Sequence, residues 1–150
     1  MKYLSFEQTI PVTMEKAWEF FSTPANLNQI TPPGLHFKIL QQLPDKMYPG
    51  ILFLYEVSPI PFIRFKWATE ITAISHHQFF IDEQRIGPYK FWHHEHHFVQ
   101  TENGVLMTDK LYYKIGKSIF GWLAGKLFID KKVKEIFEFR KKKLVELFGE

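Results

Sequence analysis

Four of the seven histidines of this chain fall within five residues, in the run His93-His94-Glu95-His96-His97. Aromatic residues surround this run and a Gly-Pro turn signal precedes it, so residues 89–100 are predicted to form a β-strand. Side chains of a strand alternate between its two faces. One face then carries Trp92, His94, His96 and Phe98, and the other carries Phe91, His93, Glu95, His97 and Val99. The first face fits a cavity for a mostly apolar molecule with one polar end, and the second suits solvent.

An acidic residue, Asp109, lies on the otherwise apolar face of another predicted strand, at residues 105–115. The residues that share its face are Val105, Met107, Leu111, Tyr113 and Ile115. This strand is expected to pair with the histidine strand, which would place Asp109 near His94 or His96. Because an unpaired buried carboxylate is costly, Asp109 is predicted to bond an imidazole, a tyrosine or Arg140.

These polar groups allow three interpretations. In the first they form a structural network that fixes strand register and leaves the cavity inert. In the second the imidazoles hold the polar end of an apolar ligand, with the terminal helix as the lid. The apolar cavity walls would then be Tyr55, Trp67, Trp92, Phe98 and Met107, and Tyr113 is expected to reach the same cavity. In the third, His94 and Asp109 form an acid–base pair, as in a cyclase, dehydratase or hydrolase.

Metal binding is weighed separately, because His94 and His96 lie two residues apart on one strand face. Two ligands do not make a site, and a third would have to come from Asp109 or a distant residue. No metal and no cofactor are therefore expected, and His93 and His97 would bind nickel or zinc only adventitiously. The chain also lacks a serine nucleophile elbow, a phosphate-binding glycine loop and a dinucleotide fingerprint.

Length and composition predict a single domain, at residues 1–150. They also predict a cytoplasmic protein. The chain has no cysteine, no apolar signal-peptide core and no apolar run that approaches about 20 residues. Aromatic residues make up 17% of it, an excess that favours either a wide cavity or an aromatic core. Its net charge of +3 comes mainly from lysines in the last forty residues, where acidic residues are interleaved with them. That pattern is typical of a solvated helix, so we expect no nucleic-acid partner and at most peripheral membrane contact.

The order of predicted elements is a strand, two short helices, six strands and a long helix. The first strand ends at Pro11, Thr13 caps one helix, and Thr23 with Pro24 begins the next. Hairpin-like links then join strands at residues 35–42, 50–57, 63–75, 78–85, 89–100 and 105–115. A helix follows from residue 117 to the end. An α+β helix-grip arrangement is the simplest packing: a curved seven-stranded antiparallel sheet wrapped around the terminal helix.

This element order, the run Phe-Ser-Thr-Pro-Ala-Asn-Leu-Asn-Gln-Ile-Thr-Pro-Pro at residues 21–33 and the histidine strand resemble the SRPBCC, or START-like, superfamily. Birch pollen allergens and polyketide cyclases share its helix-grip fold. Within it, the chain is similar to bacterial ligand-binding proteins that are sometimes labelled cell-division inhibitors. The related pattern often has a glutamine at the position of Gln84, so Gln84 is expected to face inward rather than Asp82 or Glu83. The resemblance leaves the substrate open, because this fold hosts carriers, receptors and enzymes.

The sequence therefore predicts a carrier or sensor that binds a small hydrophobic or amphipathic molecule between the sheet and the terminal helix. The expected ligand-binding residues are Tyr55, Trp67, Gln84, Trp92, His94, His96, Phe98, Met107, Asp109, Tyr113 and Arg140. Two alternatives remain open: a cyclase- or dehydratase-like enzyme that uses His94 and Asp109, and a protein-interaction role related to cell division. Ligand identity, oligomeric state and strand register are not determined. A slip of one residue would exchange the inward histidines for His93 and His97.

Overall fold

The computed structural model describes residues 1–60, 62–116 and 126–149. In chain order the elements are β1 (Lys2–Ile10), α1 (Met14–Ser22), the 3₁₀ helices η1 (Pro24–Ile30) and η2 (Pro33–Leu35), β2 (Lys38–Ile39), β3 (Leu52–Ile60), β4 (Ile63–Ser75), β5 (Phe79–Ile86), β6 (Tyr89–Thr101), β7 (Gly104–Ile115) and α3 (Lys126–Phe148). The predicted order of strands and helices is confirmed.

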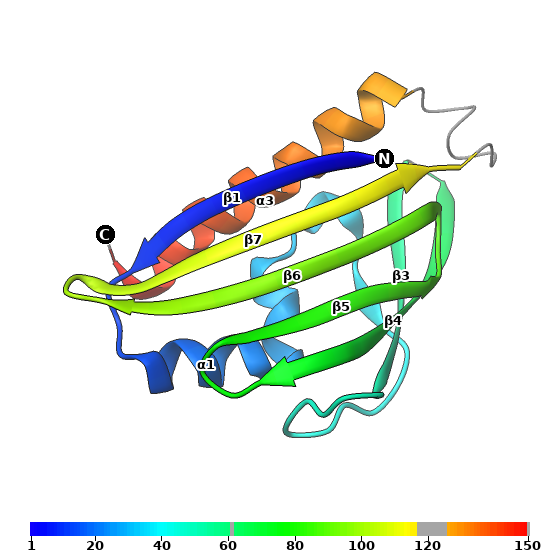
Figure 1. Cartoon of the computed structure of the whole chain (residues 1–150). Coiled ribbons are helices and arrows are strands. Elements are labelled where there is room, and N and C mark those ends of the chain that lie inside the picture. Colours follow the sequence, from blue (N-terminus) through cyan, green and yellow to red (C-terminus); the bar gives the residue numbers. More distant parts are fainter. Residues whose placement is uncertain (61, 117–125, 150) are drawn as a thin grey trace.

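The seven strands form one antiparallel sheet in the order β1-β7-β6-β5-β4-β3-β2. From β3 to β7 each strand pairs with the next one along the chain, as short hairpin links require. β2 pairs with β3 across a longer link at residues 40–51, and β1 closes the series by pairing with β7. The sheet is strongly curved, and α3 runs behind β1 and β7 on its concave side (Figure 1). The predicted helix-grip arrangement is confirmed.

Two apolar clusters hold the helices against the sheet. The first surrounds α1, where Trp18 and Phe21 meet the ring of Phe98 at centroid distances of 5.6 and 5.4 Å. The second joins α3 to β1 and β7, and in it Phe137 stacks on Phe6 at 4.2 Å. The inward residues of α3 are Ile129, Val133, Phe137, Arg140 and Leu144. Their spacing follows the helical repeat, so α3 presents one buried stripe to the sheet.

Two predicted elements differ from the structure, and one predicted helix cap is present. Residues 35–42 were expected to form a full strand, but only Lys38–Ile39 pair, because Pro33–Leu35 form a 3₁₀ turn and His36 takes a left-handed conformation. The second short helix is a 3₁₀ helix, and the Thr23 side chain makes no capping bond to it. Thr13 does cap α1, since its hydroxyl accepts a hydrogen bond from the Lys16 amide at 3.3 Å.

The predicted start of the long helix, at residues 117–125, lies outside the described residues, and α3 is described from Lys126. Paired charges lie along its outer side, including Lys132 with Glu135 and Lys143 with Glu146. Among the described residues, no helix combines the length and the apolar character that crossing a bilayer requires.

Candidate functional site

A cavity of about 190 Å³ lies between the concave side of the sheet, η1 and α3. Most of its walls are apolar. They include Phe20, Phe21, Leu27, Ile30, Phe37, Phe53, Val57, Ile71, Phe80, Val133, Ile136 and Phe137. A cavity of about 150 Å³ is large enough to admit benzene, so this one has room for a somewhat larger apolar group.

The strand register brings four polar side chains together at one side of this cavity. Asp82 of β5 is the pairing partner of His94 in β6, and His96 of β6 is the pairing partner of Asp109 in β7. His94 and His96 are two residues apart, so their side chains share the concave face. Each ring also packs on a core aromatic residue. The network therefore lies where the two apolar clusters meet, since the His96 ring stacks on Phe80 at 4.2 Å and the His94 ring meets Phe137 at 5.4 Å.

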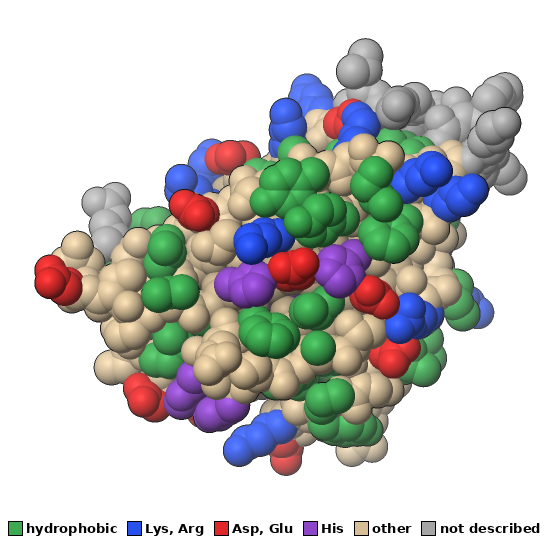
Figure 2. All heavy atoms as spheres, viewed as in Figure 1, with side chains coloured by type: hydrophobic (Ala, Val, Ile, Leu, Met, Phe, Trp, Pro, Cys, Tyr) green, Lys and Arg blue, Asp and Glu red, His purple; other side chains and the backbone are tan. Residues whose placement is uncertain are grey.

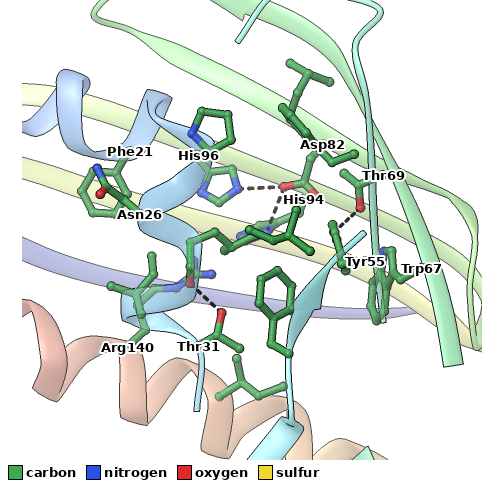
Figure 3. A pocket seen from close by; sticks show the side chains of 18 of the residues that line it. Phe21, Asn26, Thr31, Tyr55, Trp67, Thr69, Asp82, His94, His96 and Arg140 are labelled. Atoms are coloured by element: carbon green, nitrogen blue, oxygen red, sulfur yellow. Dashed lines mark hydrogen bonds and ion pairs between the residues drawn. The ribbon is translucent and has the colours of Figure 1, made fainter. Parts of the chain in front are cut away.

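The histidines are held between two carboxylates. On one side, Oδ2 of Asp82 lies 2.8 Å from Nε2 of His96 and 3.4 Å from Nδ1 of His94 (Figure 3). On the other side, Oδ1 of Asp109 lies 2.8 Å from Nε2 of His94. The same oxygen is 2.9 Å from Nδ1 of His96, although the angles there do not give a hydrogen bond. Nη1 of Arg140 reaches Oδ1 of Asp109 at 3.4 Å and completes the network.

Burial is the largest influence on the protonation of these groups, and it disfavours their charged forms. It raises the pKa of Asp82, but hydrogen bonds from His94 and His96 outweigh it, so the net shift lowers that pKa. Burial is likewise outweighed at Asp109, where the Arg140 guanidinium and the same imidazoles hold the pKa well below its usual range. The His94 pKa is lowered by burial and raised more strongly by the two carboxylates. The network therefore favours ionised carboxylates facing a protonated His94.

Two other buried polar atoms at the cavity have no hydrogen-bond partner within the described part of the chain. They are Nε1 of Trp67, on β4, and Nε of Arg140, on α3. Figure 3 places these two residues on opposite sides of the cavity. Tyr55, by contrast, bonds the Thr69 hydroxyl, and burial raises its pKa. The cavity thus contains donors that the protein itself leaves unsatisfied.

Six of the eleven residues predicted to bind ligand line the cavity. They are Tyr55, Trp67, Trp92, His94, His96 and Arg140. Asp109 lies behind the two imidazoles. It faces a second space of about 210 Å³ between β1 and α3, which fewer residues line and which Met107 also borders. The first space is mainly apolar and holds the imidazoles. The second is bordered by charged groups such as Glu7 and Glu138.

The other predicted residues have different surroundings. Phe98 and Met107 are buried in the cluster around α1 and do not line the main cavity. Tyr113 was expected to reach the cavity, but it is 1% exposed within the second cluster and its hydroxyl donates to Asp130 at 2.7 Å. Both differences have one cause: the concave face of the long strands also supports α1 and α3, so only its middle part borders the cavity.

Gln84 was expected to be the inward polar residue of its strand, and the structure corrects this. Its amide donates to the Tyr89 carbonyl at 2.7 Å and accepts from the Tyr89 amide at 3.2 Å, which closes the turn between β5 and β6. Glycine at position 87 leaves room for this arrangement, since a Cβ there would lie 2.3 Å from the Gln84 side-chain oxygen and would displace that side chain. Gln84 is thus committed to the turn.

Asp82 is a polar cavity residue that was not predicted from the sequence, because Gln84 was preferred to it. A signal for it was present, because Asp82 has the same strand parity as Phe80, which belongs to the core. The sequence could not say which residue of β5 faces His94. That assignment depends on how β5 and β6 align across their turn.

No family model and no curated protein sequence matches this chain. Solved structures do match over nearly its whole length. The protein CV1439 from Chromobacterium violaceum superposes with a TM-score of 0.74 at 10% identity, over 99% of this chain and 97% of that one. Ms6760 from Mycobacterium smegmatis gives 0.69 at 15% identity, over 97% and 89%. Ara h 8.0201 gives 0.64 at 12% identity, over 97% and 98%.

At such low sequence identities, the similarity to these structures shows a shared fold only. The seven-stranded antiparallel sheet, the short helices after β1 and the long terminal helix make this chain a helix-grip protein, like Ara h 8.0201. The helix-grip fold that the sequence predicted is thereby confirmed. The cavity of this chain lies between the sheet and α3 of this fold.

Proposed function

We propose that this protein binds a small, mostly apolar molecule with a polar or anionic end and acts as a carrier or sensor. The observation that carries the proposal is an apolar cavity with a histidine–carboxylate cluster at one side and two buried donors, on opposite sides, that the protein leaves unsatisfied. A ligand acceptor at Nε of Arg140 or Nε1 of Trp67 would remove an energetic cost of about 1–3 kcal/mol per donor. Apolar walls would supply most of the affinity.

The proposal is tested with 1-anilinonaphthalene-8-sulfonate, whose fluorescence rises in apolar surroundings and whose sulfonate imitates an anionic ligand end. We expect saturable binding of one probe per chain. Val57→Phe fills part of the cavity and should weaken binding by about tenfold or more, equivalent to about 1.4 kcal/mol. Leu54→Phe is the matched control, because Leu54 lies on the same strand and is 44% exposed on the other face.

Equal affinity of the two folded variants would contradict the cavity assignment. Trp92→Ala provides a second test, since Trp92 lines the cavity without belonging to the fully buried core. It should also weaken probe binding in a protein that keeps its circular dichroism spectrum. Tyr113→Ala, in contrast, should lower stability and leave the affinity of the folded protein nearly unchanged, because Tyr113 lies outside the cavity.

One observation favours a second candidate function. His94 Nε2 is bonded to Asp109 at 2.8 Å, while the ring borders the cavity, which is the arrangement of a general base held by a carboxylate. A cyclase- or dehydratase-like reaction would then require turnover that disappears in a folded His94→Gln variant. Binding of substrate-like probes without turnover in the wild-type protein would leave the carrier function as the better account.

A further inference from the structure

Three side chains at the cavity have the chemistry and the spacing of metal ligands. Asp82, His94 and His96 each offer one donor atom, and the three atoms lie within 4.8 Å of one another. Oδ2 of Asp82 is 2.8 Å from Nε2 of His96 and 3.4 Å from Nδ1 of His94. Donors bound to one ion at about 2.1 Å lie about 3.0–3.4 Å apart, so these distances match those between neighbouring ligands of a single ion.

One carboxylate lies on the far side of both imidazoles. Oδ1 of Asp109 is hydrogen-bonded to Nε2 of His94 at 2.8 Å, and it lies 2.9 Å from Nδ1 of His96 without the angles of a hydrogen bond. Arg140 holds Asp109 in turn. Histidines that bind metals commonly donate their second ring N–H to such a carboxylate. An imidazole that carries its proton on the far nitrogen alone has a near nitrogen that can bind an ion, so an ion would displace any proton from that position. The two carboxylates thus have different positions: Asp82 lies on the cavity side and Asp109 behind the rings.

The backbone fixes this arrangement before any ion arrives. The four residues come from β5, β6 and β7, which are neighbours in the sheet, and they are directly paired as Asp82 with His94 and His96 with Asp109. His94 and His96 are 4% and 6% exposed. Sites on rigid, adjacent strands hold their ligands more accurately than sites on loops do.

We propose that Asp82, His94 and His96 bind one divalent ion of a first-row transition metal, with Asp109 as the supporting hydrogen-bond acceptor. Two imidazole nitrogens and one carboxylate oxygen favour ions such as Zn²⁺, Fe²⁺ or Co²⁺ over Mg²⁺ and Ca²⁺. Three protein ligands leave at least one position open, and the cavity lies on that side. Both carboxylates and Arg140 together carry one negative charge, so a bound divalent ion gives the site one positive charge. That charge would attract an anionic group.

The ion can bind with no organic molecule present, so this inference and the proposed carrier function are tested separately. Untagged protein is stripped with EDTA and titrated with Co²⁺ and then with Zn²⁺, with calorimetry and the visible absorption of bound Co²⁺ as readouts. We expect one equivalent of either ion. Trp92 gives an independent signal, because its ring centroid is 6.4 Å from that of His94 and bound Co²⁺ should quench its fluorescence.

The matched variants use the two faces of β6. Asp82→Asn and His96→Gln should each weaken Co²⁺ binding by about tenfold or more. The double variant His93→Gln/His97→Gln alters the same residue types on the opposite face and should retain the one-equivalent site. Where a substitution at His96 prevents folding, Asp82→Asn alone decides, because Asp82 is only partly buried.

Three outcomes would overturn the proposal: no stoichiometric binding to the wild-type protein, unchanged binding in the folded Asp82→Asn variant, or loss of binding in the His93/His97 double variant. The last result would mean adventitious binding at the surface. A protein that binds 1-anilinonaphthalene-8-sulfonate but no metal would refute the metal site and leave the proposed function standing. A protein that binds the metal but not the probe would refute the proposed function and leave the metal site standing.

Discussion

Strand β6 carries two histidine–carboxylate clusters that have nearly the same bond lengths and opposite surroundings. On the concave face, His94 and His96 lie 2.8 Å from Asp109 and Asp82, and their side chains are 5% and 8% exposed. On the convex face, Glu95 lies between His93 and His97, 3.2 and 2.7 Å away, and these imidazoles are 23% and 32% exposed. Figure 2 shows the convex cluster as a row of histidine and acidic side chains in the middle of the surface.

The difference between the clusters is one of solvent rather than geometry. Water solvates the partly exposed groups of the outer cluster, so the contacts between them contribute little to folding. The inner groups have lost that hydration, so each depends on its partners and the loss of one leaves another charge buried and unpaired. The same pattern of residues can therefore be a solvated surface feature on one face and a buried network beside a cavity on the other.

The largest predicted difference is in stability. Asp109→Asn should lower the free energy of unfolding by about 3–5 kcal/mol, because it leaves Arg140 without its carboxylate in the interior. Glu95→Gln, the matched change on the outer face, should cost about 1 kcal/mol or less. Urea unfolding measures both values, provided that the m-values of the variants agree. A similar loss of unfolding free energy in the two variants would mean that burial does not make the inner cluster more important for stability than the outer one.

A second pair of variants extends the comparison to β7, where Tyr113 faces inward and Tyr112 outward. Tyr113→Phe removes a hydrogen bond to the Asp130 carboxylate and should cost about 1.5 kcal/mol. Tyr112→Phe should change stability by less than about 0.5 kcal/mol, since Tyr112 packs on Tyr3 at the convex face through its ring. Thermal and urea unfolding of the two variants check this. An equal loss in both would contradict the assignment of faces.

The smallest effect concerns high pH. Burial, and next the nearby Tyr113, raise the pKa of Tyr89 above its ordinary value of 10.0. The unfolded chain therefore loses this proton first, and the contribution to stability is complete below pH 10 and declines as the pH rises toward the folded pKa. The loss at pH 11 should be at most about 1.4 kcal/mol. Between pH 9 and pH 11, urea unfolding should show a smaller decline in the free energy of unfolding for Tyr89→Phe than for the wild-type protein. An identical decline in both proteins would contradict the raised pKa of Tyr89.

Much of the site follows from strand alternation, which is a local property of the chain. The parity of β6 and β7 puts His94, His96 and Asp109 on one face before any contact is known. Arg140 is also readable, because it continues the buried stripe of Val133, Phe137 and Leu144 at helical spacing even though lysines surround it. Local periodicity and apolar burial agree at these positions, so the sequence predicted them.

Other features depend on residues far apart in the chain. Whether Phe98, Met107 and Tyr113 face a cavity or a helix is decided by where α1 and α3 pack, and the strand pattern is the same in both cases. The short extent of β2 depends likewise on the 3₁₀ turn before it and on how few residues of β3 it meets. Parity predicts the face of a side chain but not what covers that face.

The sequence by itself determined the order of the elements, the helix-grip arrangement and the inward direction of the imidazoles, because periodicity and turn chemistry act over a few residues. Only the tertiary structure decided that Asp82, rather than Gln84, meets the histidines. That choice depends on the alignment of β5 with β6 and on the amide of Gln84 being used to close their turn. The alignment of two strands is a property of the pair, so neither strand specifies it alone.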